Sequence, residues 1–426
     1  MKIGAAAVEI TPALGLPMDG YGARVGGATG VHDPLYARVL VAEGADGTGL
    51  ALVVADLLQI DPRLQAIIAT DVLRSTGIPR ERLQLAGTHT HSGPAFAAPS
   101  DVEQETGQAI ARAVGQAWAE RREAVVGMGV GRVEGIGANR RPNGGPLDDR
   151  VTVTRFDDVH GRPIATHVNY GCHPTTLGPD NNRYSADFPG SACRRIEEAI
   201  GGVAVFSTGP QGDVNPGGYS PEGSMVGVVV PWRTFESAER YGEALAEVAI
   251  TVHGSIKPAS VDRVWGTARV VELRRKELPD RTVARTAADG AARSADAIRA
   301  AGLSADATYH ATVAAAYADL IATQAADPDR DRPVQVRISA LTFGPMLHVG
   351  VSGELFVALG QRIRTALGEE RTTIAALCDG SVGYLPTADA FAEGGYEPNA
   401  SVLIPGEGER LVEAIIELAK PAAGTT

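Results

Sequence analysis

A continuous apolar run at residues 50–60 limits the folds that are open to this chain. The run, LALVVADLLQI, is typical of a β-strand that is buried on both faces. Asp61-Pro62 then begins a helix that extends to about Thr76, with the proline in a favourable first-turn position. Residues 82–88 predict the next strand. Together these segments predict a βαβ unit, and we expect an α/β fold with a mixed β-sheet core and flanking helices.

The rest of the chain continues this alternation, and we expect a single domain over residues 1–426. A short first strand ends at Pro12. Further strands are predicted at 125–133, 151–156, 164–170, 203–206, 261–273 (a strand or hairpin), 334–351 (two strands) and 373–377, and helices at 102–119, 189–200, 234–253, 352–366 and 408–420. We interpret the Gly- and Pro-rich segment 217–232 as a loop over the site. The alanine-rich segment 280–326 is predicted to be mostly helical, with a break near Gly302, and to be either structural or a lid.

The composition argues against several classes of function. A formal net charge of −12 is unfavourable for binding nucleic acids or anionic membranes, because such surfaces need clustered Lys and Arg. The three cysteines (Cys172, Cys193 and Cys378) lack the spacing of a disulfide framework or a structural zinc site. The sequence has no apolar run of roughly 20 residues and no apolar signal core at its N-terminus. We therefore expect a cytoplasmic protein with a small-molecule substrate and no stable membrane association, and leave homo-oligomer formation open.

The most specific motif is GTHTHSGP at residues 87–94, at the end of the predicted strand 82–88. Residues two apart on a strand point to the same face, so we expect His89 and His91 to lie together where the strand opens into a loop. Metals and substrates commonly bind at that position in α/β proteins. The alternative interpretation is a polar turn with solvated histidines.

Other polar residues also follow predicted strands. His173 comes after strand 164–170, and Glu354 lies where a strand meets a helix. Together with His89 they offer the three ligands that a catalytic zinc ion usually takes. Taken alone, His173 is explained equally well as a histidine at the end of a strand that only hydrogen-bonds to the backbone. Taken alone, Glu354 is better explained as a first-turn residue that the helix dipole favours.

The turn at residues 207–216 carries Gln211, Asp213 and Asn215, which we expect to contact the substrate. Asp187 and Asp213 are interpreted either as carboxylates that orient the ligating histidines or as turn residues. Three further histidines receive plainer interpretations, two as core residues and one as a turn residue able to reach the pocket: His167, His348 and His32.

These segments, in this order, resemble the catalytic domain of the neutral/alkaline (non-lysosomal) ceramidase family. The resemblance covers nearly the whole chain, and residues 87–94 are its most specific part. The other matching segments are Gly4–Thr11, Gly20-Tyr21-Gly22, Asn139-Arg140, His173-Pro174-Thr175, Gly212-Asp213-Val214, Gly353-Glu354, Gly383-Tyr384 and Tyr396-Glu397. The resemblance implies a ceramidase-type fold with the active site at the carboxyl ends of strands.

The resemblance also implies one zinc ion per chain and a role for each matching residue. The implied ligands are His89, His173, Glu354 and Tyr384. Tyrosine is an uncommon zinc ligand, so its chemistry alone leaves Tyr384 either a ligand or a neighbour of one. The implied catalytic residues are His91, which shuttles protons, Tyr396, which stabilises the oxyanion, and Arg140, which contacts the substrate.

Two departures from the family bear on function. The ceramidases have a serine after the GDV motif that their activity needs, whereas this chain has Asn215. Asparagine has no nucleophilic hydroxyl, although it can hydrogen-bond a carbonyl or amide group. We also expect a shorter, cytoplasmic relative that lacks the C-terminal immunoglobulin-like domain of the ceramidases.

We therefore expect a zinc-dependent hydrolase in which activated water cleaves an amide, or an ester or lactone, of a small or medium-sized substrate. The first alternative is a true ceramide amidohydrolase, which converts N-acylsphingosine to sphingosine and fatty acid. The second is a non-catalytic relative that binds a small ligand.

Overall fold

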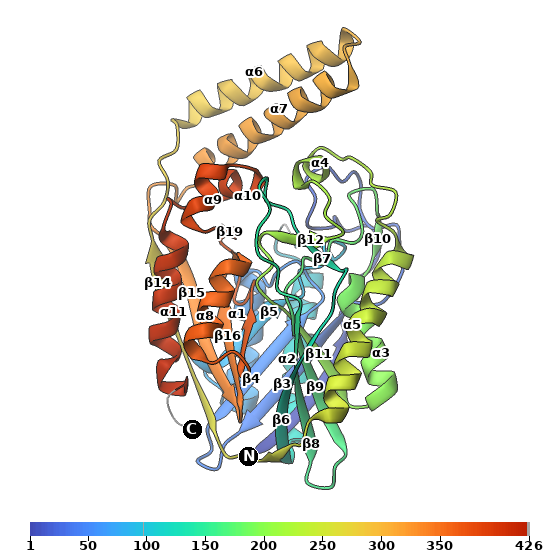
Figure 1. The fold of residues 1–426 in the computed structure, drawn as a ribbon, viewed down its shortest axis with the longest axis vertical. Coiled ribbons are helices and arrows are strands. Elements are labelled where there is room, and N and C mark those ends of the chain that lie inside the picture. Colours follow the sequence, from blue (N-terminus) through green and yellow to red (C-terminus); the bar gives the residue numbers. More distant parts are fainter. Residues whose placement is uncertain (97, 424–426) are drawn as a thin grey trace.

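A nine-stranded mixed sheet forms the centre of the computed structural model, which describes residues 1–96 and 98–423 (Figure 1). Its main path is β11-β9-β8-β6-β1-β3-β4-β5, and β13 pairs with β6. The terminal pairs β11–β9 and β4–β5 are parallel, and the other neighbours on the path are antiparallel. The strands are β1 (Lys2–Glu9), β3 (Tyr36–Glu43), β4 (Gly49–Ala55), β5 (Leu83–Gly87), β6 (Arg122–Arg132), β8 (Arg150–Asp158), β9 (Pro163–Tyr170), β11 (Val203–Thr208) and β13 (Ala259–Ser260).

A four-stranded sheet packs against one face of the first sheet. Its strands are β14 (Val264–Leu273), β15 (Val334–Phe343), β16 (Met346–Val351) and β18 (Thr372–Ala375). The first three are antiparallel neighbours, and β18 runs parallel to β16. One buried cluster joins the two sheets, with Leu40 and Leu52 from the first and Leu341 and Phe343 from the second.

Helices cover the outer faces of both sheets, so the predicted mixed sheet with flanking helices is confirmed. The pair α1 and α2 packs on one half of the large sheet, α3 and α5 on the other half, and α8 and α11 on the small sheet. Their bounds are α1 (Pro62–Thr76), α2 (Asp101–Ala119), α3 (Asp187–Ile200), α5 (Phe235–Ser255), α8 (Val357–Leu367) and α11 (Glu407–Ala423).

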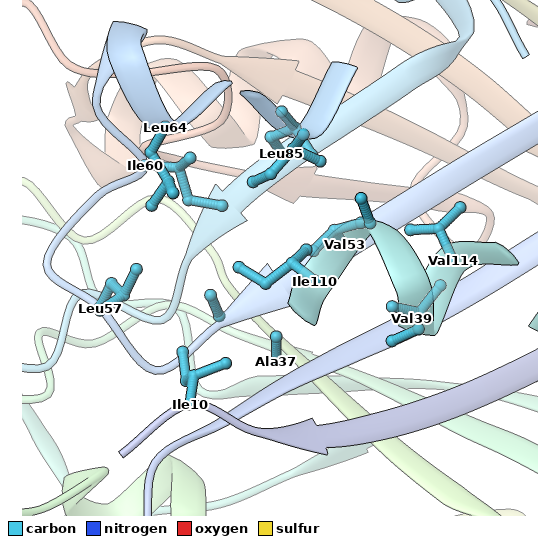
Figure 2. Packing of buried hydrophobic residues seen from close by; sticks show 14 of the residues in the cluster. Ile10, Ala37, Val39, Val53, Leu57, Ile60, Leu64, Leu85, Ile110 and Val114 are labelled. Carbon is cyan, nitrogen blue, oxygen red and sulfur yellow. The ribbon is translucent and has the colours of Figure 1, made fainter. Parts of the chain in front are cut away.

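This layering explains the apolar run at residues 50–60. Val39 and Val53 belong to the cluster that includes Ile110 of α2, which Figure 2 shows from close by. Their chain neighbours Leu40 and Leu52 instead belong to the cluster between the sheets. Since successive residues of a strand face opposite sides, both sets must be apolar. The predicted βαβ unit forms from β4, α1 and β5, although the strand ends at Ala55 rather than at residue 60.

Two helices extend beyond the sheets as an antiparallel hairpin (Figure 1). They are α6 (Arg281–Ala300) and α7 (Ala305–Ala326), and the predicted break occurs at Gly302. The phenol of Tyr317 in α7 donates a hydrogen bond to Glu222 in α4 (Pro221–Met225) over 3.0 Å. A lid function for this hairpin or for residues 217–232 stays a prediction. None of the helices in the described ranges combines the length and hydropathy of a membrane span.

A buried aspartate joins the two sheets near the end of β5. Asp379 follows β18 in the left-handed conformation, with φ of 65°. Its Oδ1 accepts hydrogen bonds from Arg80 (2.8 Å) and from the backbone N–H of Leu85 (3.1 Å). Its Oδ2 accepts one from Arg337 of β15 (3.2 Å). The carboxylate therefore holds β5 in place shortly before the chain reaches His89.

We expect Asp379→Ala to lower the free energy of unfolding by about 2–4 kcal/mol, because it leaves a buried N–H group and two partly buried arginines without their acceptor. The matched variant Asp379→Asn keeps an acceptor oxygen and tolerates the left-handed conformation, so it should lose less. Urea unfolding of both variants measures the difference. Equal losses in the two would contradict this account.

Candidate metal centre

His89 and His91 lie in the loop after β5 and not on the strand, which ends at Gly87. His89 has a φ of 70°, so the strand geometry expected from the sequence does not apply. The rings are nevertheless adjacent, with their Nε2 atoms 3.3 Å apart. Nδ1 of His89 lies 3.0 Å from the carbonyl oxygen of Leu58. Because a carbonyl only accepts, we assign the proton of His89 to Nδ1, which leaves a lone pair on Nε2.

His173 follows β9 and has the same tautomer. Its Nδ1 lies 2.8 Å from the carbonyl oxygen of Val214. Burial, and then the nearby Arg140, lower the pKa of His173 to about 4. The ring is therefore neutral at pH 7, and its Nε2 lone pair is also free.

Glu354 lies in a two-residue strand, β17 (Glu354–Leu355), which pairs in parallel with β19 (Tyr384–Leu385). The helix expected from residue 352 begins only at Val357, so the first-turn interpretation of Glu354 is wrong. Pairing with β19 extends the backbone before the helix. Gly212 packs closely against this strand, since a Cβ there would lie 2.4 Å from the carbonyl oxygen of Glu354.

Three acceptor atoms meet at this point. Oε2 of Glu354 lies 2.8 Å from Nε2 of His173 and 3.6 Å from Nε2 of His89, and all three residues are buried. Two imidazole lone pairs and a carboxylate repel one another at these distances unless a cation balances them. Two histidines and a carboxylate are also the ligand set of many catalytic zinc sites. These residues therefore fit a divalent metal ion.

Backbone carbonyls orient His89 and His173. The interpretation of Asp187 and Asp213 as the carboxylates that orient these histidines is therefore wrong. Asp187 accepts the backbone N–H groups of Leu177 (3.2 Å) and Phe188 (2.7 Å). Asp213 accepts the amide of Asn139 (2.9 Å) and the N–H of Val357 (2.9 Å), which caps the first turn of α8. Both carboxylates are occupied in stabilising the local backbone.

Arg140 links the other expected site residues. Its Nε donates to Glu397 over 2.6 Å, and its Nη2 donates to the hydroxyl of Tyr384 (3.1 Å) and to the carbonyl of Gly212 (3.0 Å). The rings of Tyr384 and Tyr396 lie 5.5 Å apart between centroids. Glu397 balances the charge of the buried Arg140, a role that the sequence analysis missed although the Tyr396-Glu397 motif contains it.

A cavity of about 100 Å³ reaches this cluster of acceptor atoms at His173, which is one of its lining residues. Its wall is formed by His91, Arg140, His173, Thr175, Tyr384 and Tyr396, together with residues 20–22 and part of the segment 219–225. The loop position expected for residues 217–232 thus brings side chains of this segment to the cavity. His91 has a buried Nδ1 that has no hydrogen-bond partner among the described residues.

The remaining expected residues lie farther into the protein or at its surface. The buried Asn215 donates to the carbonyl of Tyr219 (2.8 Å), and both amide atoms of Gln211 are buried without a partner in the part of the chain described. With Asp213, their contact with substrate stays a prediction. The exposed His32 stacks on Phe235, with centroids 3.8 Å apart, and does not line the cavity. Two histidines are fully buried in the core, as expected: His167 and His348.

Comparison with known proteins places this chain in a family. Residues 1–225 match the family model described as neutral/alkaline non-lysosomal ceramidase, N-terminal. The chain belongs to this family. Neutral ceramidases B and A of Dictyostelium discoideum are 24% and 26% identical to it over 258 and 260 residues. Each alignment covers 52% of this chain and only 36% of the relative.

Two solved ceramidase structures share the fold. The neutral ceramidase of Pseudomonas aeruginosa superposes with a TM-score of 0.76 at 19% identity, covering 99% of this chain and 74% of that one. A ceramidase complexed with C2 gives a TM-score of 0.75 at 17% identity, covering 100% of this chain and 76% of that one. The chain thus has the ceramidase fold, as the sequence resemblance implied.

We expect the purified protein to hold about one divalent metal ion per chain. His89→Ala and Glu354→Gln should each lose it, because each removes one of three converging ligands. Elemental analysis after gel filtration measures the metal content. The control His160→Ala removes an exposed histidine and should retain the ion. Full metal content in both ligand variants would show that other residues hold the ion.

Proposed function

We propose that the chain is a zinc-dependent hydrolase that uses an activated water molecule to cleave an amide bond of a small or medium-sized substrate, with esters or lactones as related targets. The observation that carries the proposal is the convergence of His89, His173 and Glu354 beside a small cavity in a ceramidase fold. Bound zinc supplies a Lewis acid and makes hydroxide available from water near pH 7. Imidazole-rich ligand sets favour zinc over calcium or magnesium.

The ligands proposed for the ion are His89, His173, Glu354 and Tyr384. The pairing of β17 with β19 supports the inclusion of Tyr384, because it sets this residue directly beside Glu354. Burial, and then the charge of Glu354, raise the pKa of the Tyr384 phenol well above its ordinary value. In the metal-free chain the phenol therefore keeps its proton, and its oxygen accepts a hydrogen bond from Nη2 of Arg140.

Proton transfer is proposed for His91 and charge stabilisation for Tyr396. Burial, and then His89 and His173, lower the pKa of His91 well below its ordinary value, so the ring is neutral and can accept a proton. The proton that His91 takes from the activated water would then pass to the leaving amine. Burial raises the pKa of Tyr396 to about 12, so its phenol stays protonated and can donate a hydrogen bond to the carbonyl oxygen as negative charge develops there. Arg140, on the same wall, is proposed to contact the substrate.

Ceramide is the second candidate substrate, because the relatives from Dictyostelium are named neutral ceramidases. The cavity of about 100 Å³ favours a smaller molecule. Pockets that enclose drug-sized ligands have volumes of about 300–1,000 Å³, and the two long chains of a ceramide need still more room. A ceramide would have to leave most of its alkyl chains outside this cavity.

We expect the zinc-loaded protein to hydrolyse short N-acyl amides faster than N-hexadecanoylsphingosine in detergent, and to lose activity with a chelator. Release of amine or acid from a panel of amides, esters and lactones measures this. His91→Ala should keep the metal and lower kcat by about 10²–10⁴-fold, because it removes the proposed proton carrier.

The matched control His32→Ala, remote from the cavity, should leave kcat unchanged. Full activity in metal-free protein would contradict the zinc mechanism. Faster turnover of the long-chain ceramide would establish the second candidate. A metal-loaded protein that hydrolyses no member of the panel would favour the ligand-binding relative.

A further inference from the structure

A buried guanidinium lies directly behind the cavity wall. Arg233 is only 6% exposed, and its Nη1 donates to the hydroxyl of Ser224 over 2.8 Å. Its Nη2 donates to the hydroxyl of Tyr21 and to the carbonyl oxygens of Thr175 (2.9 Å) and Leu177 (2.9 Å). Ser224, Tyr21 and Thr175 all line the cavity. Arg233 is thus hydrogen-bonded to three residues of the cavity wall.

This cation has no ion-pair partner among the described residues. Among all the described residues, no carboxylate oxygen lies within 4.0 Å of a guanidinium nitrogen of Arg233 or of its neighbour Arg24. Arg24 bonds only to the backbone carbonyls of Asp19 (2.8 Å) and His91 (2.6 Å). The two guanidinium carbons lie 5.1 and 5.4 Å from the centroid of the Tyr21 ring. Buried charges are normally paired, so the buried Arg233, with the half-buried Arg24 beside it, favours an anion in this cavity.

Ser224 is the group that can present this charge to a ligand. Its oxygen accepts from Arg233, which leaves its own proton to donate, and no acceptor for that proton occurs in the described ranges. A hydroxyl polarised by a cation is a stronger donor than a free one. Arg140, the third guanidinium at the cavity, is already paired with Glu397 over 2.6 Å and does not compete for the same anion.

We propose that the substrate carries a carboxylate, which accepts the hydrogen bond of Ser224 with Arg233 behind it. This inference rests on the proposed function, and it narrows the substrate to a short N-acyl amino acid. A carboxylate matches the site because it only accepts hydrogen bonds and supplies the missing negative charge. The volume of about 100 Å³ matches a short acyl group on a small amino acid.

The experiment compares N-acetylglycine with N-acetylglycinamide, which differ only in the terminal group, a charged carboxylate in the first and a neutral carboxamide in the second. Release of the free amine by the metal-loaded protein gives kcat/KM for each. We expect the acid to be favoured by about 10-fold or more, the size of effect typical of a hydrogen bond between a polarised donor and a charged acceptor. Ser224→Ala should remove most of this preference. The matched control Ser75→Ala, on α1 and remote from the cavity, should leave both rates unchanged.

A binding measurement separates this inference from the proposed function. In the metal-loaded His91→Ala variant, in which turnover is slow, ligand-observed NMR titration gives Kd for the same two molecules. Tighter binding of the acid by a native protein that hydrolyses neither molecule nor any member of the panel would support the carboxylate site and defeat the proposed hydrolase. Equal hydrolysis of both molecules, or a preference for the acid that survives Ser224→Ala, would overturn the carboxylate site and leave the hydrolase intact.

Discussion

The contact between the two sheets is the constraint on which the site depends. His89 and His173 follow strands of the large sheet, whereas Glu354 and Tyr384 belong to the part of the chain that forms the small sheet and its connections. Neither part holds all of the residues proposed to bind the metal. Burial of the apolar faces brings the two parts together, and Asp379 reinforces that contact next to β5. The free energy of this burial offsets the repulsion among three acceptor groups in the metal-free chain.

The electrostatics of the cavity differ from those of the molecule as a whole. The formal net charge of −12 would disfavour an anionic ligand at an average point of the surface. Around the cavity, however, Arg24, Arg140 and Arg233 gather, and only Arg140 has a carboxylate partner within 4.0 Å in the described part of the chain. Local charges in a site of low dielectric outweigh distant surface charges that water and salt screen. Net charge therefore argues against broad classes of partner and says little about the ligand.

Sequence reasoning succeeded where the signal is local. The apolar run at 50–60, the proline after it and the GTHTHSGP motif each occupy a short window, and they predicted the βαβ unit and the adjacent histidines. It failed where a distant partner decides the conformation. Residues 352–356 resemble the start of a helix, but pairing with Tyr384–Leu385 keeps them extended. The central strand β3 was not predicted, and Arg233 escaped notice because a lone arginine in a loop forms no pattern.

The sequence by itself determined the class of fold, the most specific candidate metal-binding motif and, through its resemblance to the ceramidases, the candidate ligand residues. These depend on side-chain periodicity and on residue types at fixed spacing, which the sequence displays directly. Only the tertiary structure decided which groups orient the histidines, how small the cavity is and which cations have no carboxylate partner among the described residues. Those properties arise from contacts between residues far apart in the chain, such as Arg233 with Tyr21 and His173 with Glu354. Their strength depends on exclusion of water, which no short stretch of sequence specifies.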